Sequence, residues 1–279
     1  MRIVVAALFY LVPAIGAADT VSVGGVTVVI PAPEGFAAVT HDMAALYEYQ
    51  EQLVAPGSEE LAAFIPEGDV PAALRGRIPD LSRRFSAQTS KKNLTAIAST
   101  ADFANLKVFA KSQNEELTKT VERSLPGLTA DRNASITKKF GAEFAVSPLG
   151  MMPLAFHDES DRTLAWSAFV KGTTNYPDGK TTLYVNVVTT TLVLLNGKVL
   201  HLYCFGDQGD LEWSREASKR WANAIIAANP RTLDSRVKEP VPLARKPFNW
   251  EDMALNGVQG ALIALALGWM VTKTRRKAS

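Results

Sequence analysis

The sequence predicts an α+β domain, an antiparallel sheet sandwiched by helices (α/β/α), followed by one C-terminal transmembrane helix. Three observations lead to this prediction: strand-like runs joined by tight-turn dipeptides, amphipathic helical stretches, and an apolar run that stops at a basic block. With 279 residues, 47% hydrophobic and 21% charged, the chain can bury a core without disulfide bonds.

The first residues, MRIVVAALFYLVPAIGAADT, have the pattern of a secretory signal peptide. A single positive charge at Arg2 precedes a short apolar stretch, a helix-breaking proline, and small residues around Ala17 and Ala18. An uncleaved anchor is the alternative, but roughly ten apolar residues are too few to span a bilayer. We therefore expect residues 1–18 to be a signal peptide.

The next segment predicts a hairpin, a helix and two strands. VSVGGVTVVIP turns at Gly24 and Gly25, because glycine tolerates the positive φ of tight turns. Asp42 is the expected cap of a helix that ends near Leu53, before Pro-Gly. ELAAFIP and RRFSAQTS have strand character, and a short helical or irregular segment, 71–77, lies between them.

From Ser99 onward the spacing of apolar residues predicts a long amphipathic helix. Ser99 and Asp102 resemble a capping arrangement at its start. Its apolar positions are Phe103, Leu106, Ala110, Leu117 and Val121. We interpret its charged face as a solvated surface, with a partner-binding surface as the alternative. A second helical stretch is expected near 129–140.

The last part of the domain is rich in strands. One hairpin is expected to turn at 158–161, and another at Asn196-Gly197, the strongest hairpin signal in the chain. A final helix is expected from Asp210 to about Ala228. One face of it carries Trp213, Ala217, Trp221 and Ile225, spaced four apart. Long hairpins followed by a helix predict a helix-covered antiparallel sheet, so we assign residues 19–229 to one exported α+β domain.

VTVVIPAPEGF, the long hairpin around Asn196-Gly197 and the Trp-bearing last helix are together similar to exported domains of the PsbP-like group. The resemblance covers roughly Val21 to Asn229. It implies a central antiparallel sheet sandwiched by helices, and accessory or assembly roles rather than catalysis. The C-terminal spanning helix is a departure from that group.

The C-terminal end predicts a membrane anchor. Leu255 to Val271 contains no charge, and Trp250 and Trp269 are about 28 Å apart along a helix, close to hydrocarbon thickness. We expect a Pro-rich tether at 230–250, a transmembrane helix at 251–272 and a basic cytoplasmic tail at 273–279. A buried C-terminal helix of a soluble core is the alternative, but it does not explain the basic block.

The charge distribution bears on location and partners. The formal net charge is +2, but residues 3–272 carry 25 basic and 28 acidic side chains. This part of the chain lacks the excess of positive charge that nucleic-acid binding requires, so we expect no nucleic-acid partner. Because basic flanks stay cytoplasmic, the domain should face outward, and we expect a bacterial inner membrane with the domain in the periplasm. A eukaryotic secretory membrane is the alternative.

No sequence motif identifies catalytic, cofactor-binding or metal-binding residues, so we predict none of these sites and no cofactor. His41, His157 and His201 have no metal-ligand spacing. The run 157–161, HDESD, is either a solvated hairpin tip or a hard-cation site, and the tip is the simpler interpretation. Cys204 lies in a strand-like run and is interpreted as a buried structural thiol.

Two functions from different classes follow. The first is a membrane-tethered, non-catalytic periplasmic module for assembly, stabilisation or sensing of an envelope component. Its expected partners are the lipid bilayer and an envelope or membrane protein, with self-association through Gly260, Ala264 and Gly268, whose small side chains share one helix face. The alternative is a membrane-tethered hydrolase with a site assembled from distant residues, in which a histidine converges with a serine or carboxylate.

Overall fold

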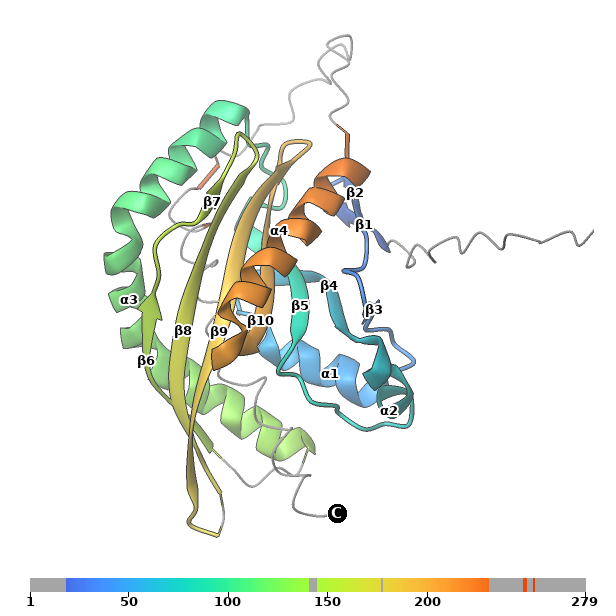
Figure 1. Ribbon diagram of the computed structural model, residues 1–279, viewed down its shortest axis with the longest axis vertical. Helices are drawn as coiled ribbons and strands as arrows, with labels where there is room; N and C mark the ends of the chain where they lie inside the picture. Colours follow the sequence, from blue (N-terminus) through green and yellow to red (C-terminus); the bar gives the residue numbers. More distant parts are fainter. Residues whose placement is uncertain (1–18, 141–144, 177, 231–247, 250–252, 254–279) are drawn as a thin grey trace, which may run out of the picture.

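The computed structural model describes residues 19–140, 145–176, 178–230, 248–249 and 253 (Figure 1). The predicted signal peptide therefore lies outside the described residues. So does the predicted transmembrane helix with Gly260, Ala264 and Gly268, apart from Met253. Within the described part of the chain, no helix is long and apolar enough to cross a membrane.

One large antiparallel sheet organises the domain. Its strand order is β3-β4-β5-β10-β9-β8-β6, and the short β7 also pairs with β8. The strands are β3 (Phe36–Ala38), β4 (Ser58–Pro66), β5 (Arg84–Ser90), β6 (Ala145–Pro153), β7 (Asp158–Glu159), β8 (Thr163–Asn175), β9 (Thr181–Leu195) and β10 (Lys198–Asp207). A separate two-stranded hairpin contains β1 (Asp19–Val23) and β2 (Val26–Ile30).

Two of the three predicted hairpin turns are confirmed. Asn196 and Gly197 join β9 to β10 with φ values of 47° and 80°, and Gly24 and Gly25 join β1 to β2 with φ values of 53° and 83°. Two successive positive φ values match the right-handed twist of the strands on either side. The register of both hairpins follows from these turns.

Helices cover both faces of the sheet, so the predicted sandwich is confirmed. On one face lie α1 (Ala44–Leu53), α2 (Val70–Leu74) and α3 (Thr100–Phe140), and on the other lie α4 (Leu211–Ala228) and the β1–β2 hairpin (Figure 1). Each face has its own apolar core. Leu46, Phe103 and Tyr203 belong to the first core, and Trp221 and Ile225 belong to the second.

The helix starts and ends differ from the sequence predictions in two places. Asp42 does not cap α1: the cap position is Met43, because the Met43 amide closes a turn onto the Thr40 carbonyl (2.9 Å) before the helix begins. The two helical stretches expected after Ser99 are one helix, α3, which runs through Pro126. An interior proline removes one hydrogen bond and its ring clashes with the carbonyl four residues earlier, which costs about 3 kcal/mol. The later turns of α3 nevertheless stay helical and contact the domain, where Ser135 Oγ donates to Gln52 Oε1 of α1 (2.9 Å).

The predicted start of α3 is confirmed. The Ser99 amide donates to Asp102 Oδ2 (2.8 Å), and the Asp102 amide donates to Ser99 Oγ (3.0 Å). This reciprocal pair satisfies two of the backbone donors that a helix start leaves unpaired.

A C-terminal segment far along the chain returns to the domain. Asn93 Nδ2 donates to the Asn249 carbonyl (3.2 Å), and the Asn249 amide donates to Asn93 Oδ1 (3.1 Å). Met253 is 1% exposed in the core beneath α1 and α3, its amide donates to the Asn249 carbonyl (3.2 Å), and its carbonyl lies 2.9 Å from His201 Nε2. Residues 248–249 and 253 are therefore packed on the sheet.

Candidate functional site

Strand β5 has a polar face that is buried. Arg84, Ser86, Gln88 and Ser90 are each at most 3% exposed, and they lie on the sheet face that α1 covers. Alternation along a strand sends Phe85 and Ala87 to the opposite face, where they join the core beneath α4. Buried polar side chains are expensive unless they bond to one another, so this face is an unusual feature of the domain.

A hydrogen-bond chain links this polar face to β4. Gln88 Nε2 donates to Ser86 Oγ (3.0 Å), and Ser86 Oγ donates to Glu60 Oε1 (2.8 Å). Glu60 and Gln88 are paired positions of β4 and β5, and a register shift between Glu60 and Ala62 interrupts the pairing beside them. The shift lets β4 present Glu60 toward α1.

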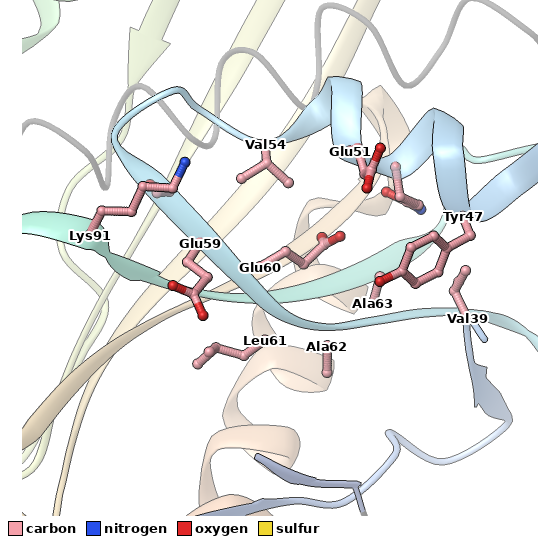
Figure 2. A pocket seen from close by; sticks show the side chains of 12 residues that line it. Val39, Tyr47, Glu51, Val54, Glu59, Glu60, Leu61, Ala62, Ala63 and Lys91 are labelled. Carbon is pink, nitrogen blue, oxygen red and sulfur yellow. The ribbon is translucent and has the colours of Figure 1, made fainter. Parts of the chain in front are cut away.

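A pocket of about 410 Å³ lies between α1 and β4. Figure 2 shows Glu60 between the strand and the helix, with Tyr47 and Glu51 projecting from α1 and Lys91 at the far end. Two further lining residues, Gln50 and Ser58, are 3% and 1% exposed. Gln50 Nε2 and Ser58 Oγ have no hydrogen-bond partner among the described residues.

Burial sets the electrostatics of this pocket. It raises the pKa of Glu60 to about 7, against the opposing effects of the Ser86 hydrogen bond and the Arg84 charge, while Glu51 raises it further. Burial also lowers the pKa of Arg84 to about 10, so Arg84 stays cationic near neutrality. Glu60 can therefore gain or lose a proton near neutral pH, and it can pair with a cation.

Of the three histidines, His157 is the one that the structure brings next to a serine. His157 Nε2 lies 3.2 Å from Ser167 Oγ, which also lies 2.9 Å from Thr189 Oγ1 and accepts a hydrogen bond from Arg215 Nε (3.3 Å). Burial first and the Arg215 charge second lower the pKa of His157. Ser167 is 0% exposed and its oxygen is shared by three neighbours, which is the arrangement of a structural hydroxyl.

We expect Ser167→Ala to lower the free energy of unfolding by about 1–2 kcal/mol, because Thr189 and Arg215 lose a buried partner. Urea denaturation of the purified chain measures this. Thr191→Val is a matched control, since Thr191 Oγ1 lies 2.8 Å from Ser218 Oγ, equally buried and away from His157. If Ser167→Ala abolished hydrolysis of an activated ester and Thr191→Val did not, the structural role would be wrong and a hydrolase would be favoured.

The remaining candidate residues are separate from one another. His41 is exposed, with its ring 4.1 Å from the Tyr47 ring, and His201 stacks on Tyr203 at 6.2 Å. Cys204 is 0% exposed on the opposite sheet face from His201, and burial raises its thiol pKa. The predicted burial of Cys204 is confirmed.

Lysines pair with two acidic side chains of the run 157–161. Glu159 bonds to Lys107 and Lys111 of α3, and Asp158 bonds to Lys219 of α4 at 2.8 Å. Among the residues that the structure describes, no group of three or more histidine, cysteine or acidic side chains is placed to hold a metal ion. Asp158 and Glu159 form β7 and pair with β8, and the Ser160 amide donates to the Thr163 carbonyl (3.0 Å), so the turn follows these two residues and does not include them as the sequence predicted. The lysine contacts tie β7 to two helices.

A second hollow, of about 370 Å³, lies over the other sheet face beside α4. Its walls include Pro31, Phe36, Trp213 and Arg220. The Trp221 indole N–H donates to the Pro31 carbonyl there (2.9 Å). The pocket beneath α1 differs because two of its buried lining atoms, on Gln50 and Ser58, have no partner among the described residues, so it is the stronger candidate for a binding site.

Comparison with known proteins gives a structural resemblance. No family model matches the chain, and no curated protein matches it. A similar solved structure is the solution structure of cyanobacterial PsbP from Synechocystis sp. PCC 6803, with 8% identity, a TM-score of 0.27, and coverage of 76% of this chain and 93% of that chain. This structure belongs to the group that the sequence resembles, and at this TM-score the likeness carries no argument about fold or function.

The residues of the pocket were not predicted from the sequence. RRFSAQTS was correctly expected to be a strand, but the position of its polar face depends on what covers it. One signal was available: the polar positions of this strand alternate with apolar ones, and the middle of a sheet rarely leaves such a face to solvent when helices cover both sides. Nothing in the sequence marks Gln50 or Ser58 as a pocket residue, because glutamine is common in helices and serine is common next to turns.

Proposed function

We propose that this chain is an exported, membrane-tethered, non-catalytic module that acts in assembly, stabilisation or sensing of an envelope component. In this proposal residues 19–229 lie in the periplasm together with the docked Met253, the apolar run 255–271 of the predicted transmembrane helix spans the inner membrane, and 273–279 lie in the cytoplasm. The chain is anchored in the bilayer and contacts an envelope or membrane protein, with self-association through Gly260, Ala264 and Gly268.

The observation that carries the proposal is the docking of the segment just before the apolar run. Asn249 is held by two hydrogen bonds to Asn93, and Met253 is buried beside His201. A spanning helix that followed this segment would be attached closely to the domain and not through a loose spacer. A displacement of the membrane anchor would then be transmitted to the sheet through these contacts.

The polar pocket supports the sensing part of the proposal. Gln88, at the end of the hydrogen-bond chain from Glu60, is the β-sheet partner of His201, which contacts Met253. The pocket and the docked segment therefore share one face of the sheet. A membrane-tethered hydrolase remains the second candidate, and the contact between His157 and Ser167 is the observation that favours it.

Site-specific labelling tests the topology. Cys204 is the one cysteine of the chain and is 0% exposed, so a cysteine introduced at an exposed position is the reactive one. In cells with a permeabilised outer membrane, we expect an impermeant maleimide to label Lys180→Cys, at the exposed β8–β9 turn, and to leave Ser279→Cys unlabelled. Ser279→Cys should react after the inner membrane is lysed.

The opposite labelling pattern, or labelling of both variants in intact inner membranes, would contradict the proposed topology. Crosslinking in membranes followed by affinity purification then tests the partner. A partner that the full chain retains and a chain truncated after Asn229 loses supports recognition through the C-terminal segment, and a partner retained by both supports recognition through the sandwich. Absence of a partner in both would favour the hydrolase.

A further inference from the structure

The pocket between α1 and β4 contains polar atoms that the domain itself does not satisfy. Gln50 Nε2 and Ser58 Oγ are buried without a partner among the described residues, and both side chains line the pocket with Glu60. Burial of a polar group without a hydrogen bond is costly, so native proteins avoid it outside functional sites. Three polar groups from α1 and β4 therefore converge on one hollow.

The charges around the pocket define what it accepts. Glu51, Glu59 and Glu60 line it together with Lys91, and Arg84 lies behind Glu60 on β5. With Glu60 ionised, three carboxylates face two cations. Lys91 Nζ already donates to the Pro56 carbonyl (3.1 Å), and Arg84 Nη1 donates to the Leu81 carbonyl (2.8 Å) while its guanidinium lies 3.9 Å from the Phe205 ring centre. One further positive charge in the pocket would make the number of cations equal to the number of carboxylates.

We infer that this pocket binds the primary ammonium group of a small aliphatic amine, with Glu60, Ser58 and Gln50 as its three acceptors. An ammonium group has three N–H donors and no acceptor. The Glu60 carboxylate and the Ser58 hydroxyl accept directly, and a half-turn of the Gln50 amide presents its oxygen. Val39, Val54, Ala62 and Ala63 supply apolar walls for the aliphatic stem. This inference concerns the pocket alone and does not depend on the proposed membrane topology.

The charge state of Glu60 makes binding depend on pH. The Glu60 carboxyl has a pKa of about 7, so it is mostly protonated at about pH 6 and mostly ionised at about pH 8. The other ionisable groups around it are Tyr47, Tyr49 and Glu51 on α1, Glu59 on β4, Arg84 on β5 and Lys91. Burial raises the pKa of Tyr49 and leaves Arg84 cationic near neutrality, so neither changes charge in this interval.

Calorimetric titration of the full chain in detergent with putrescine tests the inference. Butane-1,4-diol is the matched probe, because it has the same length and hydrogen-bonding ends without the charge. We expect putrescine to bind about ten-fold more tightly at about pH 8 than at about pH 6, since the ionised fraction of Glu60 changes by about that factor. The diol should bind at least about ten-fold more weakly than putrescine at the higher pH.

Two variants with the same charge change separate Glu60 from the general acidity of the rim. Glu60→Gln keeps the acceptor for Ser86, and we expect it to weaken putrescine binding at least about ten-fold and to remove the pH dependence. Glu59→Gln should change the affinity by about two-fold or less and keep the pH dependence, since a rim charge is screened by solvent. Circular dichroism and thermal melting check that both variants are folded.

Ser58→Ala is the second variant within the site, and we expect it to weaken putrescine binding about three-fold or more, as loss of one hydrogen bond to a charged group does. The inference is overturned if putrescine does not bind, if the diol binds as tightly as putrescine, or if folded Glu60→Gln and Glu59→Gln behave alike. None of these results bears on the labelling pattern that tests the membrane topology, so the two proposals fail separately.

Discussion

Gly24→Ala should lower the free energy of unfolding by about 2–5 kcal/mol, one of the two largest effects expected in the described chain. A Cβ at this position would lie 1.7 Å from the Leu94 carbonyl oxygen and 2.6 Å from its carbon. Both contacts are with backbone, so no side chain can rotate away. The Leu94 carbonyl also accepts a hydrogen bond from the buried Lys198 Nζ (2.7 Å).

The loss of stability in Gly24→Ala comes from the apolar core beneath α4 as well as from the turn itself. If the β1–β2 hairpin moves away from Leu94, Val23, Val28 and Ile30 leave the apolar core beneath α4. Urea denaturation of the purified chain, followed by far-ultraviolet circular dichroism, measures the loss.

Gly25→Ala is the matched control for this prediction. Gly25 also has a positive φ, 83°, but a Cβ there would meet nothing within 4 Å. We expect a loss of about 1 kcal/mol, the cost of the left-handed backbone alone. Equal losses in the two variants would show that the contact with Leu94 does not constrain the hairpin.

Trp221→Ala should lower the free energy of unfolding by about 3–5 kcal/mol. The Trp221 side chain is 2% exposed, and its ring meets Phe64 and Phe85 edge-on, with ring centres 5.6 Å and 5.1 Å apart. The substitution opens a cavity between α4 and the sheet. It also leaves the Pro31 carbonyl without the indole donor. The midpoint and slope of a urea transition give the change.

Trp213→Ala is the comparison, because it removes the same kind of side chain about two turns earlier on the same helix. Trp213 is only half-buried, and its ring lies 6.0 Å from that of Phe85 and beneath the Arg83 guanidinium. We expect a loss of about 1–2 kcal/mol. A loss at Trp213 that matched or exceeded the loss at Trp221 would contradict the assignment of Trp221 as the main contact between α4 and the sheet.

The differences between prediction and structure have local physical causes. α3 is a single helix although an interior proline destabilises it, because its later turns also contact the domain, as in the hydrogen bond from Ser135 to Gln52 of α1, and a short window of sequence does not contain that contact. Asp42 was expected to cap α1, but a turn between Thr40 and Met43 moves the helix start past it. Both errors concern the ends of helices, where competing local bonds decide the boundary.

β3 and β6 were not predicted, but short-range patterns in the sequence were enough to predict β1, β2, β4, β5, β8, β9 and β10, the two glycine turns and the inward face of α4. These features follow from short-range physics: Gly24-Gly25 and Asn196-Gly197 accept positive φ, strands alternate with period two, and Trp221 and Ile225 share a helix face. Each requires only residues within a few positions of one another.

The position of the pocket and the set of residues that line it depend on how the helices pack on the sheet. Alternation along β5 predicts that Arg84, Ser86 and Gln88 share a face, but not that α1 covers that face. Gln50, Glu60 and Ser86 come from three elements, and Asn249 meets Asn93 across 156 positions of the chain. Such contacts depend on how layers pack, and packing is a property of surfaces that no short stretch of sequence contains.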